Sequence, residues 1–181
     1  MIYFLPGRRG RLNGVLGQQI KELGFDIIGR EIIDDFEIYP IKKQLDIICN
    51  DIKANFWGTE HKLIGRSYGG YLIMHSLIEL LPEPYPGELL LLSPVLGKSS
   101  NLVFYGSRPP RAKKILEYAK LGKLNELNIQ IHTGDKDIGC DYKLAQEICS
   151  YMTNCKLQIL KDATHYLSKD YTYKVLKEFL I

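Results

Sequence analysis

Short apolar runs alternate with longer amphipathic segments along this chain. The amphipathic segments repeat apolar residues at i, i+3 and i+4, as at Val175, Leu176 and Phe179, which is typical of helices that pack on a sheet. We expect strands at 2–5, 25–33, 62–64, 88–92, 129–132 and 156–160, and helices at about 12–23, 40–56, 68–81, 110–121, 141–153 and 170–180. This alternation predicts an α/β fold, a doubly wound three-layer sandwich whose mainly parallel sheet of about six strands has helices on both faces.

The length of 181 residues suits one domain with a buried core. We therefore predict a single domain over 1–181, with a short flap inserted at about 95–110. In a sheet of this kind the ligand site lies at the carboxyl ends of the strands. The loops that follow the predicted strands are thus the places to look for chemistry.

Composition excludes several classes of protein. Hydrophobic residues make up 45% and charged residues 25% of the chain, which is ordinary for a globular domain. No apolar run approaches the ~20 residues of a membrane span, and the N-terminus lacks a basic leader, so we expect a cytoplasmic protein. The net charge of +3 is too small to indicate nucleic-acid binding.

The cysteines argue against a metal site. Cys49, Cys140, Cys149 and Cys155 have no CxxC spacing, and none stands with a histidine at ligand spacing. Without an export signal, we interpret all four as free thiols of a reducing compartment.

A glycine-rich segment between a predicted strand and a predicted helix carries the clearest chemical signal. Gly65-Arg66-Ser67-Tyr68-Gly69-Gly70 contains G-x-S-x-G, the turn that exposes a nucleophilic serine between strand and helix. The glycines two residues before and after the serine let strand and helix approach closely. Ser67 is the candidate nucleophile, and the alternative is a glycine-rich turn with an idle serine.

With the following Tyr71, this segment resembles the nucleophile elbow of α/β-hydrolases, particularly prolyl-oligopeptidase-like peptidases and small bacterial esterases with GxSxGGY. The resemblance covers the order of elements along the chain and is strongest at the elbow and two later loops. It implies a reduced α/β-hydrolase fold, nearly cap-less and without the family's first antiparallel strands. It also implies a catalytic triad in the order Ser, Asp, His, with no metal or organic cofactor.

The loop after the fifth predicted strand is similar to the family's strand-G-x-x-D loop. The chain reads Thr133-Gly134-Asp135-Lys136-Asp137 here, so the resemblance places the triad acid at Asp137. Asp135 and Asp141 remain alternatives. For each of these residues the competing interpretation is a solvated loop carboxylate.

The loop after the last predicted strand is similar to the family's G-H-x-L loop. It contains Thr164-His165-Tyr166-Leu167, with Thr164 where the family has glycine, and this implies that His165 is the general base. The other histidines are His61, His75 and His132, and we expect structural or surface roles for them.

Two backbone N–H groups are candidates for the oxyanion hole, which needs preorganised donors. One belongs to Tyr68, at the start of the elbow helix. The other follows the first strand, where Pro6-Gly7-Arg8 replaces the family's His-Gly-x and makes Arg8 the expected donor.

Arginines gather in the loops on the same side of the predicted sheet. Arg66 precedes the nucleophile and Arg108 lies in the predicted flap, where Phe104 and Tyr105 are candidate apolar substrate contacts. Cationic walls around a nucleophile would favour an anionic substrate. The alternative is that these are ordinary surface arginines.

The hypothesis from the sequence is a serine hydrolase that cleaves a carboxylic ester or thioester of a small molecule through an acyl-enzyme. A small serine peptidase is a weaker variant, and a non-catalytic ligand-binding protein with the same fold is the alternative class. A nucleic-acid binder is disfavoured because no binding motif accompanies the arginines. The sequence leaves open the acyl and leaving groups and the oligomeric state.

Overall fold

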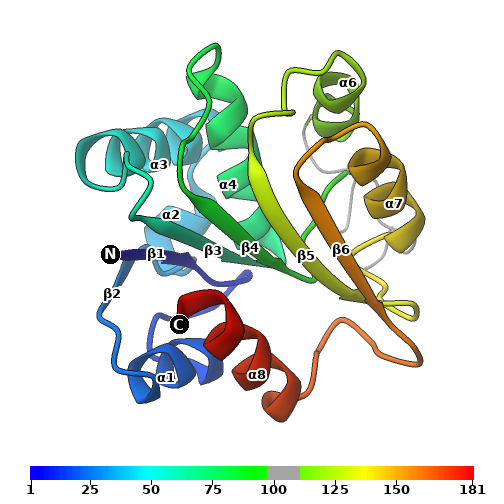
Figure 1. Cartoon of the computed structure of the whole chain (residues 1–181). Helices are drawn as coiled ribbons and strands as arrows, with labels where there is room; N and C mark the ends of the chain where they lie inside the picture. The colour runs from blue at the N-terminus through cyan, green and yellow to red at the C-terminus, as the bar shows by residue number, and fades with distance from the viewer. Residues whose placement is uncertain (98–110) are drawn as a thin grey trace.

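The computed structural model describes residues 1–97 and 111–181, which build a parallel β-sheet (Figure 1). Its order is β2-β1-β3-β4-β5-β6, and every neighbouring pair is parallel. The strands are β1 (Ile2–Leu5), β2 (Ile27–Gly29), β3 (Lys62–Arg66), β4 (Glu88–Leu92), β5 (Asn128–Gly134) and β6 (Cys155–Leu160). The predicted six-stranded parallel sheet is confirmed.

Helices cover both faces of the sheet, which confirms the predicted three layers (Figure 1). One face carries α1 (Val15–Glu22) and α8 (Lys169–Leu180). The other carries α3 (Ile41–Asn55), α4 (Tyr68–Leu80), α6 (Lys114–Lys120) and α7 (Tyr142–Ser150). The short α2 (Asp34–Ile38) follows β2 and was not expected from the sequence.

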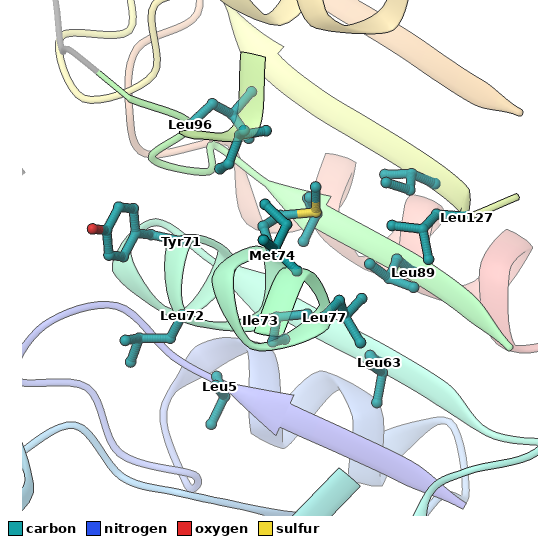
Figure 2. Close-up of a cluster of buried hydrophobic side chains, with 14 of the residues drawn as sticks. Leu5, Leu63, Tyr71, Leu72, Ile73, Met74, Leu77, Leu89, Leu96 and Leu127 are labelled. Carbon is teal, nitrogen blue, oxygen red and sulfur yellow. The ribbon is translucent and has the colours of Figure 1, made fainter. Parts of the chain in front are cut away.

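Alternate side chains of each strand enter two separate cores, because successive residues of a strand point to opposite faces. In β1, Phe4 packs toward α1 and α8, whereas Leu5 joins the cluster around α4. Helix α4 is apolar around most of its circumference, as expected for a helix buried on several sides. Figure 2 shows Ile73 and Leu77 of α4 close to the sheet residues Leu63 and Leu89. The elbow helix is thus held at the centre of the larger core.

Strand β2 is shorter than the predicted 25–33. It pairs only with β1, and the last paired position is Phe4 with Gly29. Beyond Leu5, β1 runs into Pro6, which has no N–H to donate to a further ladder bond. The chain after Gly29 therefore leaves the sheet, and the Ile32 N–H donates to the Gly10 carbonyl at 3.0 Å.

The strand order sets the position of a site. The chain leaves β1 on one side to form β2 and returns to form β3 on the other side. The carboxyl ends of β1 and β3 therefore flank the point where the order reverses. Ligand sites of doubly wound sheets lie at such a point.

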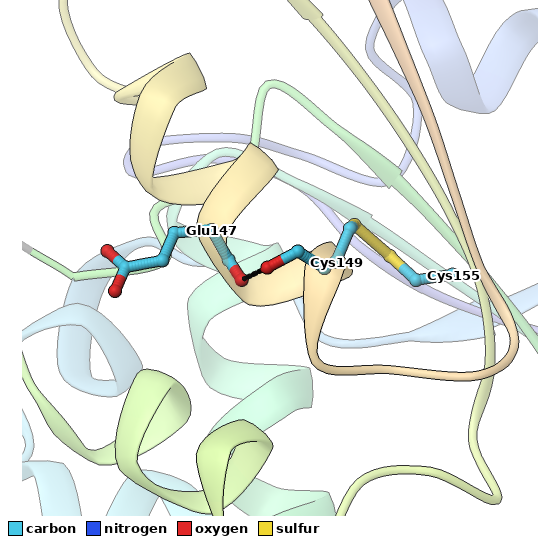
Figure 3. Close-up of a disulfide and its surroundings, with 4 residues drawn as sticks. Glu147, Cys149 and Cys155 are labelled. Atoms are coloured by element: carbon cyan, nitrogen blue, oxygen red, sulfur yellow. Dashed lines mark hydrogen bonds between the residues drawn. A yellow bond between two sulfur atoms is a disulfide. The ribbon is translucent and has the colours of Figure 1, made fainter.

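The expectation of four free thiols is wrong. Cys149 and Cys155 form a disulfide (Figure 3), whereas Cys49 and Cys140 are free. Cys149 lies in the last turn of α7 and Cys155 begins β6, so the turn between the two elements brings their Cα atoms to 5.3 Å. The sequence alone did not predict this disulfide, because a separation of six residues between two cysteines does not indicate a turn that brings them together.

The predicted flap falls almost wholly on residues 98–110, so Phe104, Tyr105 and Arg108 lie outside the described residues. Within the described part of the chain, no helix has the length and apolar character that crossing a membrane requires. The same residues contain no cluster of three or more His, Cys, Asp or Glu side chains suited to a metal ion.

Candidate active site

Ser67 occupies a strained turn between β3 and α4. Its φ is 52° and its ψ is −118°, a conformation that L-residues rarely adopt. Small neighbours make the turn possible. A Cβ on Gly69 would lie 2.2 Å from the Leu5 carbonyl oxygen, and one on Gly65 would lie 2.7 Å from the Gly70 Cα. The turn places Ser67 at the carboxyl end of the central strand β3.

His165 lies in the loop between β6 and α8 and reaches the serine. Its Nε2 is 2.9 Å from the Ser67 Oγ, although the two residues are 98 positions apart in the chain. Both side chains are buried, at 4% and 7% exposure. A neutral imidazole at this distance can accept the proton of the hydroxyl.

Asp137 lies on the other side of the imidazole. Its Oδ1 is 2.7 Å from His165 Nδ1 and accepts the backbone N–H groups of Gly139 and Cys140, at 2.7 and 2.9 Å. The Thr133 hydroxyl donates to Oδ2 at 3.1 Å. Four donors thus hold the carboxylate in one orientation.

The other two candidate acids have different surroundings. Asp141 caps α7 by accepting the N–H groups of Lys143 and Leu144, at 3.0 and 3.4 Å. Asp135 Oδ1 is buried and has no hydrogen-bond partner among the described residues. Of the three carboxylates left open by the sequence, the structure brings Asp137 to His165.

The environment of Asp137 favours its ionised form. Burial alone would raise the pKa of this carboxyl, but hydrogen bonding and attraction from His165 and the backbone bonds of Cys140 and Gly139 lower it below its usual value. The ionised carboxylate can fix the imidazole with a proton on Nδ1, which leaves Nε2 free to face Ser67.

The loop after β1 packs directly against Ser67. A Cβ on Gly7 would lie 3.3 Å from the Ser67 Cβ, so only glycine leaves ordinary room at this position. Tyr68 is the first residue of α4, where backbone N–H groups have no partner within the helix. The Arg8 guanidinium lies 4.6 Å above the Tyr68 ring. The oxyanion roles of the Tyr68 and Arg8 N–H groups remain predictions.

A cavity of about 430 Å³ opens beside His165, on the α1 and α8 side of the sheet. Arg66 lines it, and the guanidinium carbon lies 5.0 Å from the centre of the Tyr166 ring. Burial lowers the pKa of Arg66 from its usual value. Arg8 is exposed and lies outside the cavity lining.

Two polar residues of the site were missed by sequence reasoning. Thr133 supports Asp137, and Ser93 lies after β4 in the wall of the cavity. Ser93 is 1% exposed and has a φ of 46°. Its position directly after a strand was the one available signal, since strand ends carry the site in this architecture.

The remaining histidines lie away from the triad. His132 Nδ1 is 2.7 Å from the Tyr171 hydroxyl, which ties β5 to α8. His75 is fully buried within α4, and His61 Nε2 pairs with Glu60 at 2.9 Å. Each of these contacts belongs to the fold and none of them reaches Ser67.

No family model and no curated protein sequence matches this chain. Solved structures do match it. A lipase-esterase related protein from Clostridium acetobutylicum superposes with a TM-score of 0.71 at 13% identity, covering 98% of this chain and 93% of the other. Est1E from Butyrivibrio proteoclasticus, solved with ferulic acid bound, superposes with a TM-score of 0.68 at 18% identity, covering 99% of this chain and 87% of the other. The monoacylglycerol lipase of Paleococcus ferrophilus superposes with a TM-score of 0.65 at 13% identity, covering 99% of this chain and 93% of the other. At these identities the likeness concerns the fold.

Proposed function

We propose that this chain, which has the α/β-hydrolase fold, is a serine hydrolase that cleaves carboxylic esters or thioesters of small molecules. One observation carries the proposal. Ser67, His165 and Asp137 form a continuous hydrogen-bonded chain of 2.9 and 2.7 Å, buried at the ends of three parallel strands. In sequence, His165 is 98 residues from Ser67 and 28 residues from Asp137. The fold alone does not require these three side chains to meet in the order Ser, His, Asp, whereas nucleophilic catalysis does require that order.

The first half of the reaction forms an acyl-enzyme. Ser67 Oγ attacks the carbonyl carbon while its proton passes to His165 Nε2, and the carbonyl π electrons move onto the oxygen. Backbone N–H groups of Tyr68 and Arg8 would stabilise that oxyanion, helped by the positive end of α4. The bond from carbon to the leaving oxygen or sulfur then breaks, and His165 returns the proton to the leaving group.

The second half repeats these steps with water. His165 takes a proton from the water as the oxygen attacks the acyl carbon. The bond to Ser67 Oγ breaks, the proton returns to Ser67, and the carboxylic acid is released. Asp137 keeps its negative charge throughout and stabilises the imidazolium that forms in each half.

A fluorophosphonate probe tests the proposal, because it labels serines that a neighbouring base activates. We expect stoichiometric labelling of Ser67 and hydrolysis of activated acetate esters. Ser67→Ala should abolish labelling and lower turnover by about 10⁴–10⁶-fold, as the loss of a triad nucleophile does. Its unfolding free energy should change little, since serine and alanine have similar volume. A folded protein that resists the probe would instead be a ligand-binding member of this fold.

A further inference from the structure

The cavity beside His165 has the size and walls of a small-molecule site. Its volume of about 430 Å³ lies within the usual range for ligand pockets, about 300–1,000 Å³. The walls are largely apolar and include Phe4, Val15, Leu16, Leu92 and Leu167. An aromatic or branched aliphatic group fits such a surface.

Arg66 lines this apolar cavity. Arg30 and Arg111 each pair with a carboxylate, at 2.7 and 2.5 Å. The Asp137 charge attracts Arg66, but among the residues that the structure describes no carboxylate makes a direct ion pair with this guanidinium. A half-buried guanidinium without a counter-ion is costly, and a bound carboxylate would supply one with matching bidentate geometry.

A buried hydroxyl in the same cavity also lacks a partner. Ser93 Oγ is inaccessible to solvent and makes no hydrogen bond in the described part of the chain. Its backbone is in the left-handed region, at a φ of 46°, and its N–H donates to the His132 carbonyl at 2.8 Å. Unsatisfied buried hydroxyls are rare because each forfeits hydrogen bonds to water, so Ser93 is suited to donate to a ligand.

The first turn of α1 closes the cavity on a third side. Gly14, Val15, Leu16 and Gly17 line it, and Gly14 provides no side-chain cap for the helix. The N–H groups at the start of a helix and the positive end of its dipole favour a negative charge nearby. Arg66, Ser93 and the first turn of α1, all part of the cavity lining, therefore favour the same kind of ligand, one that carries a negative charge.

The position of the cavity indicates which part of an ester it would hold. His165 lines it, whereas Ser67 and the loop residues next to the expected oxyanion hole, Gly7, Arg8 and Tyr68, do not. When the tetrahedral intermediate collapses, His165 Nε2 gives its proton to the leaving oxygen as the bond from carbon to oxygen breaks. The leaving group must therefore lie on the His165 side of the serine.

We infer that this cavity binds the leaving group, and that the leaving group is a hydroxy-carboxylic acid with an apolar body. The inference rests on the proposed ester hydrolysis. Arg66 binds the carboxylate of that acid while Ser93 donates to it. Arg11, which pairs with Glu31 at 3.5 Å, and Lys169 also line the cavity and add to its preference for a negative charge. The hydroxyl of the acid, esterified in the substrate, faces His165.

Two pairs of esters test the assignment to the leaving group. The first pair is para-acetoxybenzoate and para-acetoxybenzamide, which differ in the charge of the leaving group. The second is monophenyl terephthalate and its neutral amide, which differ in the charge of the acyl group. We expect kcat/KM to favour para-acetoxybenzoate over its amide by about tenfold to a hundredfold, and the second pair to show no such preference.

Variants distinguish the effect of a charge in the cavity from the effect of the protein's overall charge. Arg66→Gln should remove the preference for para-acetoxybenzoate over its amide, Arg66→Lys should retain part of it, and Ser93→Ala should reduce it. Lys21→Gln removes one exposed positive charge from the far end of α1 and should leave the preference intact. Loss of the preference in both charge-removing variants would overturn the inference.

A binding measurement keeps the inference separate from the proposed function. In the Ser67→Ala variant, calorimetry should detect para-hydroxybenzoate, and adding Arg66→Gln should weaken its binding by about tenfold or more. If the wild type hydrolyses acetate esters without any preference for the anionic leaving group, the inference fails and the proposed function stands. If para-hydroxybenzoate does not bind, the inference also fails, whatever the labelling of Ser67 shows.

Discussion

Gly134 and Ala163 touch backbone to backbone. A Cβ on Gly134 would lie 1.9 Å from the Ala163 carbonyl oxygen, and that oxygen accepts the Lys136 N–H at 3.0 Å. Gly134 is the last residue of β5, directly before the loop that carries Asp137, and Ala163 belongs to the loop that carries His165. The segments that carry Asp137 and His165 therefore meet at a contact that leaves no room for a Cβ.

Gly134→Ala should damage both stability and catalysis. Backbone cannot yield as a flexible side chain can, so the two loops must move apart, and overpacking of this kind costs about 1–3 kcal/mol or more. Ester hydrolysis should fall by about a hundredfold, since a displacement of about 1 Å in a catalytic group has that effect. Urea unfolding and kcat/KM measure the two losses.

Gly58→Ala is the matched control for that substitution. The nearest atoms to a Cβ there would be those of the Glu60 carboxylate, at the end of a flexible side chain that is 69% exposed. Its unfolding free energy should change by less than about 0.5 kcal/mol. Equal losses in the two variants would show that the Gly134 contact has no special role.

Asp137→Asn should lower turnover far more than Asp135→Asn. The amide introduced at this position can donate a proton to His165 and stabilise the wrong tautomer, a change that costs about 10⁴-fold in a known triad. Asp135 has no hydrogen bond to His165, so its amide variant should retain activity within about tenfold of the wild type. Steady-state kinetics on one acetate ester compares the two, and a larger loss in Asp135→Asn would contradict the assigned acid.

His75 should make the protein less stable as the pH falls. Burial, helped by the nearby positive charges of Arg111 and Lys114, lowers the pKa of His75 to about 3, while Glu79 raises it slightly. In the unfolded chain the imidazole takes up a proton near pH 6.5, as free histidine does. Between these values the unfolded state binds the additional proton, so stability falls with falling pH by up to about 1.4 kcal/mol per unit.

The stabilising contribution of neutral His75 is thus fully present above about pH 6.5 and is lost progressively toward pH 3. Urea unfolding between about pH 5 and 7 covers the upper part of that window. His75→Leu should make the unfolding free energy depend less steeply on pH, because the unfolded chain then takes up one proton fewer. Ser76→Ala, at a buried neighbour that does not titrate, should shift the curve without changing its slope. An unchanged slope in His75→Leu would disprove the role of His75.

The sequence by itself determined the features that depend on local pattern. The strand-turn-helix context of Gly65, Ser67 and Gly69 identified the elbow, because close approach of strand and helix requires small residues at fixed offsets. The alternation of apolar runs and amphipathic segments determined the parallel sheet and its layers. The loops of Asp137 and His165 were singled out by their resemblance to two loops of α/β-hydrolases, and each follows a predicted strand, whose end lies at the edge of the sheet where ligand sites occur.

Contacts between distant segments were decided only by the tertiary structure. The structure brings Asp137 to 2.7 Å from His165, and the chain reversal after α7 joins Cys149 to Cys155. The cavity that Arg66 lines together with Ser93 and the first turn of α1 is built from strands and loops far apart in sequence. The pattern of apolar and polar residues does not predict which of these residues lie together, because they meet only when the carboxyl ends of the strands are assembled side by side.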